Sequence, residues 1–151
     1  SMCLVILYSR SRTPFLKSKN RPGPFAAADL ATQAGRSLLS RQKFAPDELD
    51  EVILGCAAPS VDEVNIGRVA ALRMGCGEKV PGWTVMRNCA SGMQAIDSGI
   101  GNILAGRSNL VLAGGGRLLT LKVVGWERPR CTWDLPRGRT TSRRAAEPGE
   151  I

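Results

Sequence analysis

The stretch RNCASGMQAI, from Arg87 to Ile96, places a cysteine between an apolar segment and a helical repeat. Trp83–Met86 has the length and apolar character of a buried strand, and Cys89–Leu104 has helical spacing. A thiolate at the start of a helix is stabilised by the helix dipole and by free backbone N–H groups. Cys89 is therefore the candidate nucleophile. Arg87 adds positive charge, and only small residues follow the thiol.

The same position also has a purely structural interpretation, because a free cysteine is often a small buried side chain. The other cysteines do not open a helix after a strand, and none forms a C-x-x-C pair: Cys3, Cys56, Cys76 and Cys131. The chain has no histidine, so a zinc site would need four cysteines to converge. We therefore expect free thiols and no metal site.

Apolar strands alternate with helices up to about residue 115. Strands are expected at Cys3–Tyr8, Val52–Cys56, Trp83–Met86 and Leu110–Ala113, and helices at Ala26–Leu39, Asn65–Met74 and Cys89–Leu104. Pro46 begins a further short helical segment. This order predicts an α/β fold with a parallel sheet. In such sheets ligands gather beyond the carboxyl ends of the strands, where Cys89 is expected to lie.

The helix that starts near Cys89 has two distinct faces. One is an apolar stripe of Met93, Ile96, Ile100 and Ile103, and the other carries small residues. Its glycines, Gly92, Gly99 and Gly101, each cost roughly 1 kcal/mol relative to alanine in a helix. Close packing of this helix against another backbone is expected to offset that cost.

Residues 116–151 lose the alternating pattern. They hold eight Lys and Arg and four Asp and Glu, which is +4 of the net charge of +8. We expect a poorly ordered basic tail. The basic residues could indicate nucleic-acid binding, but they lack helical spacing and interleaved stacking aromatics, so no nucleic-acid partner is expected. No apolar run has the length of a membrane span, so we expect no membrane partner and an intracellular, cytoplasmic protein.

Several motifs resemble the N-terminal part of thiolases, a family of acetyl-CoA acyltransferases. They are RTPF (12–15), DEVILGCAAP (50–59), DEVNIGRVAALRMGCGEKVPGWTV (62–85), RNCASGMQAI (87–96) and NLVLAGG (109–115). The resemblance implies a partial thiolase fold, the incomplete N-terminal half of a layered α/β/α/β/α architecture. Residues 1–115 would form this partial domain, and residues 116–151 an unrelated tail.

The resemblance also implies a chemistry. Cys89 would carry an acyl group as a thioester, in 3-ketoacyl-CoA thiolysis or acetyl-CoA condensation. CoA and acyl-CoA would be substrates, no cofactor or metal would be needed, and the protein would be a homo-oligomer. Arg12 and Arg68 could contact CoA phosphate, although structural ion pairs are favoured, and Asn65 would order a loop or a subunit contact.

The sequence departs from the thiolase pattern in its catalytic groups. The Gly-His-Pro motif, the second cysteine of Cys-x-Gly-Gly-Gly and the Asn-x-x-His-Gly-Gly motif are absent. Gly116-Arg117-Leu118-Leu119 stands where Glu-x-Met-Ser is expected. We expect a truncated thiolase, with a tail translated in a shifted frame, that lacks turnover alone. The alternative is a non-catalytic fragment that binds intact thiolase subunits.

Overall fold

The fold is an α/β sheet with helices on both faces. The computed structural model describes residues 5–14, 25–117 and 120–127. The elements, in order, are β1 (Ile6–Arg12), α1 (Ala27–Leu39), the 3-10 helix η1 (Pro46–Glu48), β2 (Glu51–Cys56), α2 (Ile66–Arg73), β3 (Gly82–Val85), α3 (Ser91–Leu104), β4 (Leu110–Arg117) and β5 (Thr120–Glu127).

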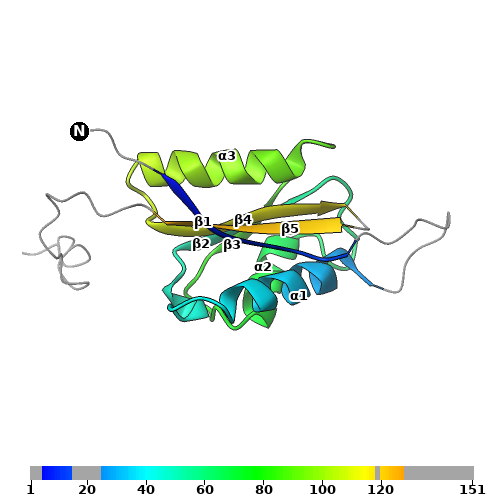
Figure 1. The fold of residues 1–151 in the computed structure, drawn as a ribbon. Helices are drawn as coiled ribbons and strands as arrows, with labels where there is room; N and C mark the ends of the chain where they lie inside the picture. Colours follow the sequence, from blue (N-terminus) through cyan, green and yellow to red (C-terminus); the bar gives the residue numbers. More distant parts are fainter. Residues whose placement is uncertain (1–4, 15–24, 118–119, 128–151) are drawn as a thin grey trace, which may run out of the picture.

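The five strands form one mixed sheet in the order β1-β5-β4-β2-β3 (Figure 1). Strand β2 pairs in parallel with β3 on one side and with β4 on the other. Strand β5 is antiparallel to both β4 and β1. Only two residues separate β4 from β5, and so short a connection can join only antiparallel neighbours. The predicted parallel sheet is therefore confirmed for β2, β3 and β4.

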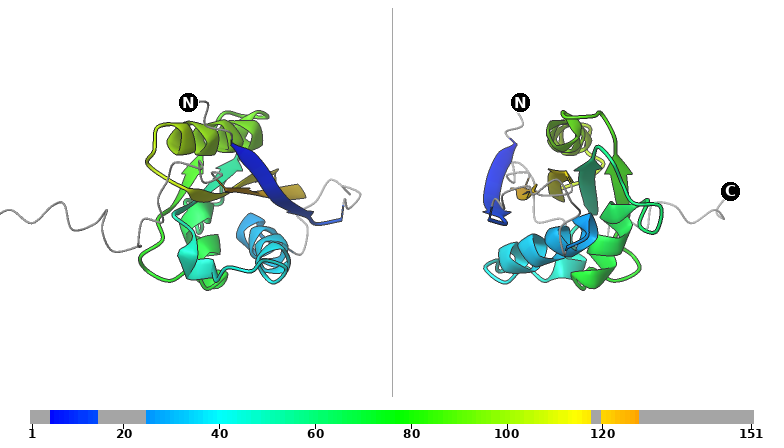
Figure 2. Two further views of the ribbon diagram at one scale, coloured as in Figure 1. Left: turned by 60° about the vertical axis from the view of Figure 1, so that its left-hand side comes forward. Right: turned by 90° about the vertical axis from the view of Figure 1, so that its right-hand side faces the viewer.

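Helix α3 covers one face of the sheet, and α1 and α2 cover the other (Figures 1 and 2). The central strand β2 is buried along its whole length, as is typical of a parallel strand between two helical layers. Its side chains alternate between the layers: Leu54 belongs to the core under α1 and α2, and Ile53 to the core under α3.

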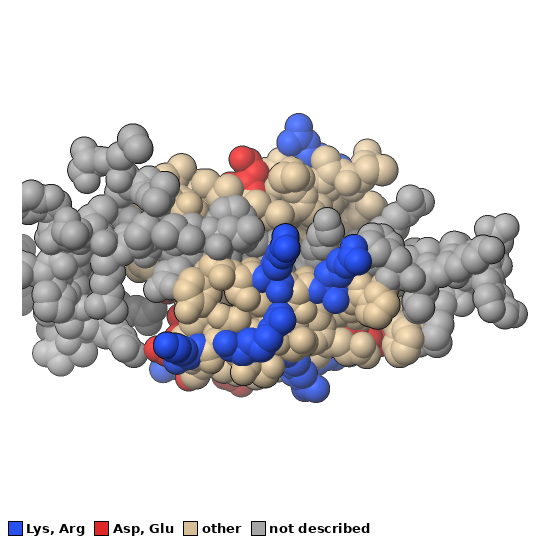
Figure 3. Space-filling view, in the orientation of Figure 1, with Lys and Arg blue, Asp and Glu red and all other residues tan. Residues whose placement is uncertain are grey.

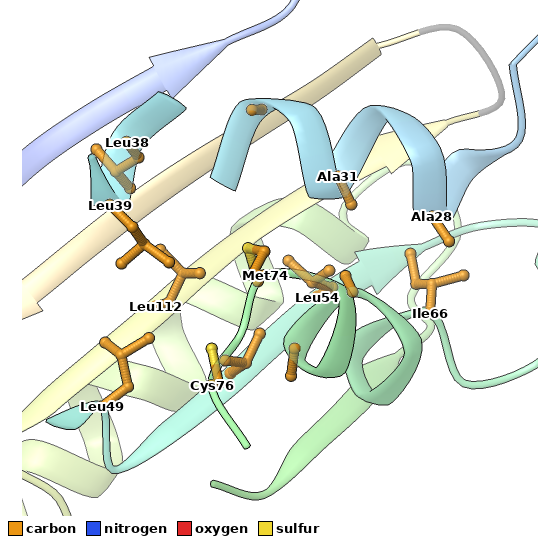
Figure 4. Packing of buried hydrophobic residues seen from close by; sticks show 14 of the residues in the cluster. Ala28, Ala31, Leu38, Leu39, Leu49, Leu54, Ile66, Met74, Cys76 and Leu112 are labelled. Carbon is orange, nitrogen blue, oxygen red and sulfur yellow. The ribbon is translucent and has the colours of Figure 1, made fainter. Parts of the chain in front are cut away.

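The larger core lies between the sheet and the pair α1 and α2 (Figure 4). Small residues of α1, such as Ala28 and Ala31, let this helix lie close to α2 and the sheet. Leu38, Leu54 and Leu112 are among the largest side chains of this core and are almost completely buried. Among the helices that the structure describes, none combines the length and apolar character needed to cross a membrane.

The predicted helix ends are confirmed where glycine follows the last turn. Gly75 follows α2 with a φ of +86°, and Gly106 follows α3 with a φ of +75°. These left-handed conformations are accessible to glycine at little cost, so each helix stops there.

The expectations for the two ends of the described chain need correction. Strand β1 extends to Arg12, further than the predicted Cys3–Tyr8, and β4 extends to Arg117 instead of ending at Ala113. Residues 120–127, expected to be poorly ordered, form β5 between β1 and β4. Three consecutive glycines follow the predicted end of β4 at Ala113, and their backbones pair with strands on both sides, so the strand continues through them.

The faces of α3 also differ from the prediction. Its buried residues follow one another at intervals of four: Ser91, Ala95, Gly99 and Ile103. Met93, assigned to the apolar stripe, is 68% exposed. The line of α3 that faces the sheet therefore combines small residues with Ile103 of the predicted apolar stripe. Ile96 and Ile100 of that stripe pack partly buried against the same core, so the prediction fails only for Met93.

Glycines allow this close approach at the start of α3. Gly55 of β2 and Gly115 of β4 are direct partners in the sheet, near the carboxyl ends of their strands. A methyl group added to Gly55 would collide with the carbonyl group of Ser91, and one added to Gly115 would collide with the backbone of Gly92. The expected packing of α3 against another backbone is thus confirmed, at its first turn.

A buried carboxylate fixes the opposite end of α3. Glu51 accepts hydrogen bonds from the Asn102 amide at 2.6 Å, the Ser108 hydroxyl at 2.8 Å and the Trp83 indole N–H at 3.1 Å. These donors come from the end of α3, the loop before β4, and β3. The network therefore ties three elements to the first residue of β2.

We expect Gly55→Ala to lower the free energy of unfolding by about 1–3 kcal/mol, the usual cost of overpacking against a backbone that cannot move aside. Urea denaturation measures this. Gly101→Ala is the matched control, because a methyl group there meets nothing within 4 Å. That control should leave stability unchanged or raise it by up to about 1 kcal/mol. Equal midpoints for Gly55→Ala and the wild type would refute the glycine contact.

Candidate active site

Cys89 lies in the turn that joins β3 to α3, and its side chain is exposed. Helix α3 begins at Ser91, two residues later than the sequence predicted. The structural interpretation of Cys89 as a small buried side chain is therefore wrong. The thiol is presented to solvent immediately before a helix that starts over the carboxyl ends of β2 and β4.

The turn around Cys89 is closed by backbone hydrogen bonds. The Ala90 N–H donates to the Arg87 carbonyl at 3.0 Å, and the Ser91 N–H donates to the Asn88 carbonyl at 3.2 Å. Asn88 adopts a left-handed conformation with a φ of +46°, the only non-glycine residue with positive φ in the described part of the chain. Asparagine tolerates this region better than most residues, because its short side chain can bond locally.

The Ser91 side chain bridges the two ends of this turn. Its hydroxyl accepts a hydrogen bond from the Arg87 N–H at 2.8 Å and donates one to the Asn88 carbonyl at 2.7 Å. Ser91 is only 3% exposed. The sequence analysis noted Ser91 only as a small residue that leaves the thiol uncrowded.

Arg87, the predicted source of positive charge, is exposed and turns toward the surface of α3. Its guanidinium group donates to the Gln94 side-chain oxygen at 2.7 Å. The Gln94 amide group in turn donates to Asp97 and Ser98 at 3.2 Å each. The guanidinium is thus held beside the first turns of α3, on the same helix that follows the thiol.

The other cysteines of the described chain are buried. Cys56 lies in β2, and Cys76 follows α2. Burial, reinforced by the negative charge of Asp47, raises the pKa of the Cys76 thiol to about 11. Cys3 and Cys131 lie outside the described residues. Cys89 is therefore the accessible thiol among those that the structure places.

Three other residues singled out from the sequence have structural partners. Arg68 donates to the carbonyl groups of Val80 at 2.8 Å and Glu78 at 3.3 Å, so it holds a loop through carbonyl groups, where an ion pair was expected. Asn65 caps α2 by accepting from the Arg68 N–H, and its amide bonds the Gly82 carbonyl of β3. Its predicted role in ordering a loop is confirmed. Arg12 ends β1, on an exposed position.

On the face seen in Figure 3, Lys and Arg side chains gather where β1 and α1 run. Residues 5–14, 25–117 and 120–127 contain no group of three or more Cys, Asp or Glu that could hold a metal ion. The chemistry available at the site is therefore that of a thiol next to a helix start.

Comparison with known proteins decides the family. Residues 5–136 match the family model described as the thiolase N-terminal domain. The chain belongs to the thiolase family. The motifs that suggested this family, including the segment around Cys89, all lie inside the matched region.

Individual relatives agree with this assignment. A probable 3-ketoacyl-CoA thiolase of Caenorhabditis elegans is 34% identical over 124 residues, which cover 82% of this chain and 28% of the relative. The trifunctional enzyme subunit beta of human mitochondria is also 34% identical and is covered to 24%. The chain thus spans about a quarter of the length of these curated thiolases.

Solved structures support the fold. An acetyl-CoA acetyltransferase of Bacillus anthracis superposes with a TM-score of 0.70 at 37% identity, covering 76% of this chain and 29% of that one. Human mitochondrial 3-ketoacyl-CoA thiolase in complex with CoA gives a TM-score of 0.68 at 33% identity, covering 75% and 30%. The predicted partial thiolase fold is therefore confirmed.

The thiolase match also extends beyond the boundary drawn from the motifs. It continues from Gly115 to residue 136 and so includes β5 and part of the segment taken to be an unrelated tail. The hypothesis of a shifted reading frame stays a prediction. The signal that was missed is the apolar run in residues 118–124, which has the composition of a strand.

We predict that iodoacetamide at neutral pH alkylates Cys89 well before Cys56 or Cys76. Cys89 is exposed, whereas the other two are buried and Cys76 stays protonated until about pH 11 in the folded protein. Peptide mapping by mass spectrometry measures the order of labelling. The control is labelling in concentrated urea, which unfolds the chain and exposes Cys56 and Cys76. The alkylation rates of the three cysteines should then be similar. Faster labelling of Cys76 in the folded protein would contradict the structure.

Proposed function

We propose that Cys89 accepts an acyl group from an acyl-CoA thioester, as the first half of a thiolase reaction. The observation that carries this proposal is the exposed thiol in the turn before α3, over the carboxyl ends of parallel strands, in a chain of the thiolase family. The names of the relatives, a 3-ketoacyl-CoA thiolase and an acetyl-CoA acetyltransferase, support acyl-CoA as the substrate class.

The acylation step needs only the thiol and the thioester. The Cys89 sulfur, as thiolate, attacks the carbonyl carbon of the thioester, and the bond from this carbon to the CoA sulfur breaks. CoA leaves as a thiolate that takes up a proton from solvent, and the acyl group remains on Cys89 as a new thioester.

Completion of the cycle requires groups that these 151 residues do not contain. In the full reaction, either CoA cleaves a 3-ketoacyl chain or a second acetyl-CoA condenses with the acyl-cysteine. Both directions need proton transfer, for which a histidine is the commonest side chain. The chain has none. General acid–base help contributes about 10²–10⁴ in rate, so we propose acylation of Cys89 without turnover by this chain alone.

Incubation with acetyl-CoA should therefore place one acetyl group on Cys89, detected by mass spectrometry of the intact chain and its peptides. Cys89→Ala should remain unmodified, and acetylation of the buried Cys56 provides an internal measure of unfolding. A thiolysis assay with acetoacetyl-CoA and CoA should give no rate above that of Cys89→Ala. Acetylation that persists in Cys89→Ala would show that Cys89 is not the acylated residue. Thiolysis above the rate of Cys89→Ala would contradict the proposed lack of turnover.

We infer as a second proposal that β3 pairs with a second copy of this chain. In the described sheet β3 lies at an edge, and β2 is the only strand that pairs with it. Asn65 bonds both the Gly82 carbonyl and the Thr84 hydroxyl, which places the neighbouring Val64 beside this edge. Val64 is 64% exposed, and Met86 at the end of β3 is 62% exposed. An edge strand with apolar neighbours favours pairing with another strand.

Sedimentation velocity should show a dimer that Val64→Glu converts to a monomer, because the added carboxylate would have to be buried in the interface. Leu104→Glu is the matched control: Leu104 is similarly exposed, but it belongs to α3 and not to the edge strand or the segment before α2. A monomeric wild type would contradict the homo-oligomer. If the wild type is monomeric, the alternative function is binding to an intact thiolase subunit. That alternative would require a full-length thiolase to bind this chain through the β3 edge.

A further inference from the structure

We propose that Ser91 is a positioning residue that holds the Cys89 turn in the shape needed for acyl transfer. The proposal rests on the function proposed for Cys89 and adds a residue to which that function did not assign a role. It is carried by the two hydrogen bonds of the Ser91 hydroxyl, by the backbone of Asn88 and by the glycine contact under α3.

The Ser91 backbone is fixed from below. The nearest atoms to a methyl group built on Gly55 are the carbonyl oxygen and carbon of Ser91, so the first residue of α3 rests directly on β2. Gly115 provides the adjoining contact with Gly92. The position of Ser91 is therefore set by its contact with the sheet.

The Ser91 side chain connects the start of α3 to the turn through two hydrogen bonds. Its hydroxyl accepts from the Arg87 N–H, two residues before Cys89, and donates to the Asn88 carbonyl, one residue before it. The Asn88 carbonyl also accepts from the Ser91 N–H. The two residues that precede Cys89 are thus bonded to the serine that begins α3, and these bonds close the turn around Cys89.

The left-handed Asn88 conformation makes these bonds important. The left-handed region of φ and ψ costs a residue other than glycine on the order of 1 kcal/mol of conformational free energy. A hydrogen bond contributes about 0.5–1.5 kcal/mol of stability, so the hydrogen bonds of the Ser91 hydroxyl are strong enough to offset the conformational cost at Asn88. Without it, the turn can relax toward a right-handed φ at Asn88, which would rotate Cys89 away from the start of α3.

Ser91 is not itself a candidate nucleophile or base. A serine hydroxyl has one hydrogen, and here it is donated to the Asn88 carbonyl. The residue is also 3% exposed, whereas Cys89 is exposed. Its effect on the chemistry must therefore act through the placement of Cys89.

The test compares Ser91→Thr with Ser91→Val, which have nearly the same shape and differ in the hydroxyl. The measurement is the rate of Cys89 alkylation by iodoacetamide at neutral pH in the full chain, read by peptide mass spectrometry. We expect Ser91→Thr to stay within about twofold of the wild type and Ser91→Val to react about threefold to tenfold more slowly, the range that loss of the helix-start field would produce.

Ser108→Ala is the matched control for a merely structural effect. Ser108 is also a buried serine, 6% exposed, and its hydroxyl donates to Glu51 at the opposite end of α3. This variant should lower the urea midpoint and leave the alkylation rate of Cys89 unchanged. Equal rates for Ser91→Thr and Ser91→Val, or an equal slowing in Ser108→Ala, would overturn the positioning role.

Two further outcomes are informative. If circular dichroism shows that neither β-branched variant folds, Ser91→Ala decides: slower alkylation than in the wild type supports the proposal, and an unchanged or faster rate refutes it. Acetyl-CoA then separates the two proposals. If it does not acylate the wild type while the difference between Thr and Val persists, the proposed acyl transfer fails and Ser91 still positions the thiol.

Discussion

The close contact between the first turn of α3 and the sheet is the constraint on which the rest of the site depends. Gly55 and Gly115 face each other across β2 and β4, and the backbone of Ser91 and Gly92 rests on them. Side chains at these positions would hold the helix away from the strands, since packed interiors leave no room for extra atoms. The glycines thus place the helix start, and with it the turn that carries Cys89.

The far end of α3 is fixed by different chemistry. The Glu51 carboxylate accepts three hydrogen bonds from neutral donors, and Asn102 also accepts from the Arg107 guanidinium. A buried carboxylate is costly unless it is fully bonded, so this network favours one register of α3 over the sheet. Steric contact at one end and hydrogen bonding at the other therefore determine where the helix lies along its own axis.

The candidate site that results is a nucleophile without an evident base. The thiolase family assignment, the exposed thiol and the ordered turn all support acyl transfer to Cys89. Because these 151 residues contain no histidine, we propose acceptance of an acyl group without completion of the cycle. This separation follows from chemistry, because a thiolate can attack a thioester unaided, whereas the later steps also need a proton carrier.

The sequence by itself determined the family, the nucleophile candidate, and the elements from α1 to the start of β4. These rest on local signals: apolar segments of strand length, glycines after helices, and the spacing around Cys89. It did not reveal β5, because a strand inserted between β1 and β4 depends on partners distant in the chain.

Only the tertiary structure decided which face of α3 is buried and how Ser91 is used. Hydrophobicity favoured a stripe that included Met93, but the glycines of β2 and β4 bring the start of α3 so close to the sheet that the buried line runs through Ser91, Ala95, Gly99 and Ile103. The role of Ser91 likewise depends on a turn whose shape is set by that contact. Both outcomes follow from contacts between β2, β4 and α3, which no local pattern in the sequence encodes.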